Sequence, residues 1–159
     1  MKSLVAWMLA SWLSLIWCLP VYAAGSCRVT TSGLAFGAFP APNPANVDST
    51  ATLTVTCRGN PSASTPFTIA LSQGNGGSFN PRTMASGTYS LDYNLYSDAT
   101  YSTIWGDGTS GTSQVSGTIP PGPPNGSNTL NFTVYGRIPG NQNLAAGSYS
   151  DAITITISY

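Results

Sequence analysis

The C-terminal residues 147–159, GSYSDAITITISY, end in a strict alternation of apolar and hydroxyl side chains. Ile153, Ile155 and Ile157 alternate with threonine and serine, and Tyr159 closes the series. Successive side chains of a strand point to opposite faces, so the isoleucines and Tyr159 share one face. Isoleucine, threonine and tyrosine also favour strands. This stretch therefore predicts an amphipathic last strand, and no further strand follows it in the sequence to pair with its free edge.

Alternation of apolar and polar residues recurs in short stretches along the rest of the chain. The stretches predicted to be strands are residues 27–31, 51–57, 67–71, 89–96 and 130–138, with shorter pieces at 104–105 and 114–118. Within residues 89–96 we expect Tyr89, Leu91, Tyr93 and Leu95 to point inward and Ser90, Asp92, Asn94 and Tyr96 to point outward. An apolar piece, residues 34–39, has a bend expected at Gly37. Short strands between turns rich in glycine and proline, without helical periodicity, predict an all-β sandwich.

Residues 1–24 have the features of a secretory signal peptide. Lys2 gives a positive start, residues 4–19 are apolar, and small residues precede Gly25. A membrane anchor is the alternative, but the apolar run is short for a span and a small-residue cleavage site follows it. Cleavage after Ala23 or Ala24 would leave residues 25–159 as one domain of ordinary size. We therefore expect an exported protein with no integral membrane segment after cleavage.

Two cysteines, Cys27 and Cys57, remain once Cys18 is removed with the signal peptide. An exported protein with two cysteines most simply forms one disulfide. The alternation of residues 51–57 directs Cys57 inward, where Cys27 can reach it. Two free buried thiols are the alternative. A zinc site is disfavoured because the chain has no histidine and no CxxC pair.

The charged residues exclude most enzymes and most anionic partners. Residues 25–159 contain four arginines and five aspartates, and they lack lysine, glutamate and histidine. Catalytic triads and Schiff bases need the missing residue types, and the aspartates lie in or beside turns, where turn hydrogen bonds explain them. Nucleic acids and anionic membranes require a basic patch. We expect no enzymatic activity, no cofactor or metal and no nucleic-acid partner, and we expect Arg82 and Arg137 to pair with aspartates.

Several short motifs follow one another along the chain after Cys27. They are LAFGAF (34–39), LTVTC (53–57), RTM (82–84), LDYNLYSD (91–98), IWGDG (104–108), VYGRIP (134–139) and GSYSD (147–151). In this order they resemble the spore coat protein U domain family, which includes subunits of archaic, Csu-type chaperone–usher pili. The resemblance covers residues 27–159. It implies an incomplete immunoglobulin-like sandwich that lacks its final strand.

The resemblance also implies an acceptor groove beside the C-terminal strand. Its wall would carry Ile153, Ile155, Ile157 and Tyr159. In such subunits a periplasmic chaperone inserts a strand into the groove, and at the outer-membrane usher the N-terminal extension of another pilus subunit replaces it. An open edge of this kind is an aggregation hazard unless it is capped. The expected function is therefore a structural subunit of a surface pilus, exported through the periplasm.

The segment before Cys27 departs from the family pattern. After the expected cleavage only Gly25 and Ser26 precede it, and at about 3.3 Å per residue they are too short to span a groove. We expect a subunit that accepts a strand without donating one, which suits the tip of a pilus. Two alternatives stay open. One is a self-complete coat or binding protein whose groove an internal segment covers, and the other is a lectin-like adhesin acting through residues 99–105 or 119–125.

Overall fold

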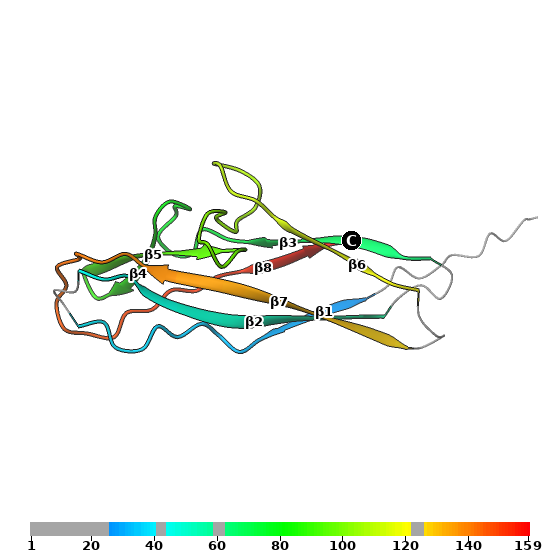
Figure 1. The fold of residues 1–159 in the computed structure, drawn as a ribbon, viewed down its shortest axis with the longest axis horizontal. Helices are drawn as coiled ribbons and strands as arrows, with labels where there is room; N and C mark the ends of the chain where they lie inside the picture. The colour runs from blue at the N-terminus through cyan, green and yellow to red at the C-terminus, as the bar shows by residue number, and fades with distance from the viewer. Residues whose placement is uncertain (1–25, 41–43, 59–62, 122–125) are drawn as a thin grey trace, which may run out of the picture.

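The computed structural model describes residues 26–40, 44–58, 63–121 and 126–159, which form two antiparallel β-sheets facing each other (Figure 1). The strands are β1 (Cys27–Thr31), β2 (Val47–Arg58), β3 (Thr65–Leu71), β4 (Arg82–Ser86), β5 (Tyr89–Tyr96), β6 (Val115–Ile119), β7 (Ser127–Ile138) and β8 (Ile155–Ser158). The larger sheet has the order β1-β2-β7-β5-β4 and the smaller one the order β6-β3-β8. The chain is thus an all-β, immunoglobulin-like sandwich, as expected.

Two parts of the sequence on which expectations depend lie outside the described residues. They are the expected signal peptide, residues 1–24, and residues 122–125 of the segment 119–125 that was considered as an adhesin loop. Within the described part of the chain, no helix is long and apolar enough to cross a membrane.

The core lies between the two sheets and follows the predicted alternation. The long strands β2 and β7 pair over twelve residues, from Val47 opposite Ile138 to Arg58 opposite Ser127. From this sheet Leu53 and Val55 are fully buried, and they meet Ile69 from β3 in one apolar cluster. The same cluster includes Trp105, which lies outside the strands and whose indole Nε1–H donates a hydrogen bond to the Ile69 carbonyl.

One disulfide joins the first two strands. Residues Cys27 and Cys57 are opposite each other in the β1–β2 register and are bonded through their sulfur atoms. The prediction of a disulfide is confirmed, and the alternative of two free thiols is wrong. The bond fixes the edge strand β1 to the sheet near one end of the sandwich.

Removing this disulfide is expected to destabilise the protein substantially. The cysteines are 30 residues apart, and closing a loop of that length is worth about 3.5 kcal/mol in the chain-entropy model. The double variant Cys27→Ser, Cys57→Ser should therefore lose about 2–5 kcal/mol of unfolding free energy. Urea unfolding can be followed by the fluorescence of Trp105, the only tryptophan after residue 24. An unchanged unfolding free energy would show that the bond does not stabilise the fold.

Two details of the strands differ from the sequence-based expectations. Residues 82–86 form a strand, β4, which was not among the predicted strands. The last strand is shorter than the alternating stretch and spans Ile155–Ser158. Gly37 has the expected bend, with a φ of 74°, and residues 34–39 follow β1 without forming a strand of their own.

Two residues of β5 lie on a different side than the alternation predicted. Tyr89 was expected to point inward but is 57% exposed, because it is the first residue of β5 and pairs with Ser86 beside the β4–β5 turn. Asn94 was expected to point outward but is buried, because the segments around Phe79 and Arg82 cover it. The prediction for Leu91, Tyr93 and Leu95 is confirmed, since all three are buried.

Candidate functional site

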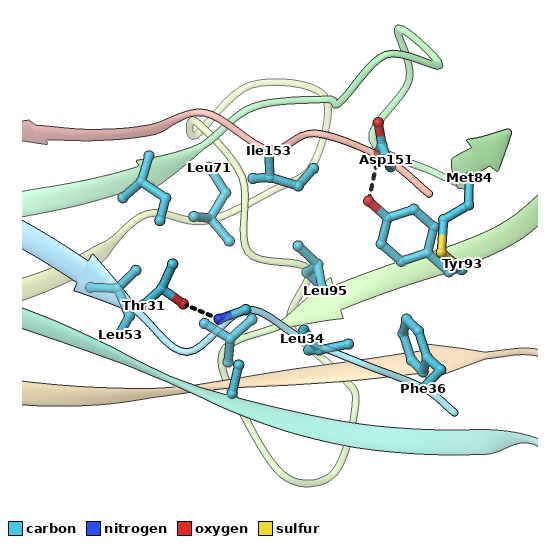
Figure 2. A pocket seen from close by; sticks show the side chains of 14 residues that line it. Thr31, Leu34, Phe36, Leu53, Leu71, Met84, Tyr93, Leu95, Asp151 and Ile153 are labelled. Atoms are coloured by element: carbon cyan, nitrogen blue, oxygen red, sulfur yellow. Dashed lines mark hydrogen bonds between the residues drawn. The ribbon is translucent and has the colours of Figure 1, made fainter. Parts of the chain in front are cut away.

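An apolar cleft lies where one edge of each sheet comes close to the other. Strand β1 ends the larger sheet and β8 ends the smaller one, so within the part of the chain that the structure describes each has a strand on one side only. The chain continues from β1 through Leu34 and Phe36, and these side chains face Ile153 across a cavity of about 210 Å³ (Figure 2). The residues around this cavity are Thr31, Gly33, Leu34, Phe36, Ala51, Leu53, Leu71, Met84, Tyr93, Leu95, Val134, Asp151, Ile153 and Ile155.

A second cavity, of about 700 Å³, continues the first. Leu34, Phe36 and Met84 line both cavities, so the two adjoin. The second is walled by residues 34–39 on one side and by residues 144–149, the segment leading toward β8, on the other. We refer to the two cavities together as the edge cleft. It runs along residues 31–39.

Strand β8 presents an unpaired backbone edge beside the cleft. Among the described residues it pairs with β3 alone, with Ile155 opposite Leu71 and Ile157 opposite Ile69. The Ser72 N–H donates to the Thr154 carbonyl at 3.0 Å, and hydrogen-bonded pairs alternate along an antiparallel ladder. The N–H groups of Ile155 and Ile157 therefore point away from β3, toward the open edge.

The four residues predicted to form the groove wall take different positions. Ile153 and Ile155 line the edge cleft. Ile157 is half-buried and packs against the core cluster. Tyr159 is 55% exposed and borders a separate, shallow depression beside Pro66 and Phe67. The role of all four as a groove wall stays a prediction.

The opposite wall of the cleft was not recognised in the sequence. It consists of Leu34 and Phe36 together with Met84 and Tyr93, and the ring centroids of Phe36 and Tyr93 are 6.0 Å apart in an edge-to-face contact. The apolar LAFGAF motif beside a proline-rich loop was the available signal for the first two. Which segment it would face depends on tertiary pairing, which the local pattern does not specify.

One polar contact, between Tyr93 and Asp151, lies in the mostly apolar lining of the cleft. The Tyr93 hydroxyl donates a hydrogen bond of 2.6 Å to Oδ2 of Asp151 (Figure 2). Burial, together with this hydrogen bond, raises the pKa of Tyr93 well above its ordinary value, so the phenol keeps its proton. Oδ1 of Asp151 accepts hydrogen bonds from the N–H groups of Asn75 and Ala152. Asp151 thereby fixes the glycine-rich loop after β3 to this end of β5.

Arg82 holds together the elements behind this loop. Its side chain is fully buried and donates to the carbonyls of Ser72 and Trp105 and to Oδ1 of Asn94. Its guanidinium also lies 5.1 Å from the centroid of the Phe79 ring. The expected pairing of Arg82 with an aspartate is wrong, because backbone carbonyls and an amide take the place of the carboxylate.

Arg137 pairs as predicted. Its Nε and Nη2 donate to the two carboxylate oxygens of Asp48 at 2.7 and 2.8 Å. The hydrogen bond from Arg137 holds the pKa of the Asp48 carboxyl below its usual value. The guanidinium carbon lies 3.6 Å from the centroid of the Tyr101 ring. This cluster joins β2 to β7 at the surface and is separate from the edge cleft.

The fold and the cleft define a class of protein, namely a two-sheet sandwich with an open apolar edge. The Spore Coat Protein U domain model matches residues 18–156, and the chain belongs to this family. No curated protein matches the sequence.

One solved structure with a similar fold is the CsuC–CsuE chaperone–tip adhesion subunit pre-assembly complex from archaic chaperone–usher Csu pili of Acinetobacter baumannii. The TM-score with a chain of that complex is 0.55 at 21% sequence identity. The match covers 86% of this chain and 40% of the other, so this chain spans about two fifths of its neighbour's length.

Proposed function

We propose that this protein is a structural subunit of a chaperone–usher pilus and that its edge cleft accepts an extended strand from a partner polypeptide. The observation that carries the proposal is the free backbone edge of β8 beside an apolar cleft. Membership of the family and the likeness to a Csu pilus complex support it. The role is non-enzymatic, because it depends on strand addition and packing alone.

The geometry suits a strand added beside β8. Such a strand would accept hydrogen bonds from the N–H groups of Ile155 and Ile157, and alternate side chains would enter the cleft. Each aliphatic side chain that becomes buried contributes about 1.5–3 kcal/mol. Several of these side chains along the cleft, together with the backbone hydrogen bonds, would offset the free-energy cost of association.

The proposed partners follow the order of assembly. A periplasmic chaperone supplies the first strand, and at the outer-membrane usher another pilus subunit supplies its replacement. The protein is then carried to the cell surface as part of the fibre. The expected position at the tip stays a prediction, because all of the segment before Cys27 except Ser26 lies outside the described part of the chain.

Periplasmic production with and without a periplasmic chaperone of an archaic chaperone–usher system tests the proposal. Alone, the protein should aggregate or be degraded, because an apolar edge is exposed. With the chaperone it should be recovered as a soluble complex of one copy each. A soluble, thermally stable monomer in the absence of the chaperone would contradict the proposal and favour a self-complete coat or binding protein.

A further inference from the structure

Asp151 is the one charged residue in the lining of the two described cavities, and it lies where they meet. Along its segment Tyr149 lines the second cavity and Ile153 lines the first. Opposite it on β5, Leu91 lines the second cavity while Tyr93 and Leu95 line the first. The hydrogen-bonded Tyr93–Asp151 pair is therefore a polar point between two apolar stretches of the same cleft.

The carboxylate of Asp151 keeps capacity for one more donor. It accepts three hydrogen bonds, from the Tyr93 hydroxyl and from the N–H groups of Asn75 and Ala152. An ionised carboxylate offers about four acceptor positions. The side chain is half-buried, and no arginine within the described residues lies within ion-pair distance of it. Water in the open cleft can reach the remaining position.

A partner strand would displace that water. An aliphatic side chain placed against Asp151 would desolvate the carboxylate without offering a hydrogen bond, and this carries a free-energy cost. A side chain with a hydroxyl, amide or ammonium group would replace the lost water. The apolar stretches on both sides carry the opposite preference, for aliphatic side chains.

Resting on the proposed function, we propose that Asp151, held by Tyr93, selects the sequence and register of the partner strand. The accepted strand carries a hydrogen-bond donor at the one inward position that faces Asp151 and aliphatic residues at the inward positions before and after it. Purely aliphatic alternation would let a strand slide by two residues and still bury the same face. The Tyr93–Asp151 pair would favour the one register in which the donor of the strand faces Asp151.

Exchange with synthetic strands tests the inference, because threonine and valine have the same shape. The chaperone-bound protein is incubated with ten-residue peptides of alternating sequence whose inward positions are all valine, and with peptides in which one inward valine is changed to threonine. Displacement of the chaperone is measured for each peptide. Threonine should improve displacement about tenfold at one inward position and weaken it at the others. Equal or better displacement by the all-valine peptide would overturn the inference.

A variant of the protein shows whether Asp151 causes the preference for threonine or whether the cleft accepts threonine regardless of Asp151. Asp151→Asn keeps the shape and removes the charge. The ratio of chaperone displacement by the threonine peptide to displacement by the all-valine peptide should therefore fall toward one at that position. An unchanged preference in the variant would also overturn the inference. If the wild-type protein exchanges with neither kind of peptide, the proposed function itself fails, which is a distinct result from exchange without preference.

Discussion

Replacing Ile155 by aspartate is expected to abolish capture of a partner strand. Ile155 lines the edge cleft, lies opposite the buried Leu71 in the β3–β8 register, and packs against the core cluster. An added strand would enclose the new carboxylate in apolar surroundings without a partner, which costs several kcal/mol. We expect the affinity for the chaperone to fall by at least about a hundredfold, measured by co-purification and by titration.

Thr156→Asp is the matched control for this variant. Thr156 is the next residue of the same strand, but its side chain is exposed on the opposite face, so the same charge should leave capture nearly unchanged. Formation of the Cys27–Cys57 disulfide in both variants would show that each of them folds. Normal co-purification of Ile155→Asp would refute the cleft as the binding site, and equal loss in both variants would point to a general effect of charge on β8.

The substitution Arg82→Met is expected to have the largest effect on stability. Methionine keeps much of the volume but removes the donors that serve the carbonyls of Ser72 and Trp105 and the amide oxygen of Asn94. Hydrogen bonds to a charged group contribute about 1.5–3 kcal/mol each, and a buried acceptor without a donor costs about 1–3 kcal/mol. Because neighbouring contributions do not add, we expect a total loss of about 3–5 kcal/mol of unfolding free energy.

Arg58→Met is the matched control for Arg82→Met, since Arg58 is exposed at the end of β2. It should change the unfolding free energy by less than about 0.5 kcal/mol. Urea unfolding followed by Trp105 fluorescence compares the two variants under the same conditions. A loss of less than 1 kcal/mol in Arg82→Met would mean that water satisfies the three acceptors, contrary to the burial of the site.

The alternation of side chains was sufficient to predict the sandwich and most of its strands, and the two cysteines that remain in an exported chain predicted its disulfide. The alternation predicted the inward positions of Leu53, Val55 and Cys57 because β2 is paired there on both sides, with β1 and with β7. It was wrong at Tyr89 and Asn94. Alternation separates the two faces of a strand, but it does not show where the opposite sheet ends or where a loop covers the outer face.

The candidate site was predicted on one side only. The alternation of residues 153–159 was enough to predict one wall of the site, and Ile153 and Ile155 do line the cleft. Leu34 follows β1, whereas Met84 and Tyr93 belong to the β4–β5 hairpin, so these side chains meet only in the folded sandwich. The burial of Arg82 without a carboxylate was missed for the same reason, because only the fold brings its acceptors together, namely the carbonyls of Ser72 and Trp105 and the amide oxygen of Asn94.

Amide protection along β8 tests the central claim most directly. In the free protein the N–H of Thr156 points toward β3, whereas the N–H groups of Ile155 and Ile157 point toward the open edge. Hydrogen exchange by nuclear magnetic resonance, with and without the chaperone or a strand peptide, resolves these amides. Binding should slow exchange at Ile155 and Ile157 by at least about a hundredfold and change Thr156 far less. Tight binding that leaves the exchange of Ile155 and Ile157 unchanged would contradict strand addition at this edge.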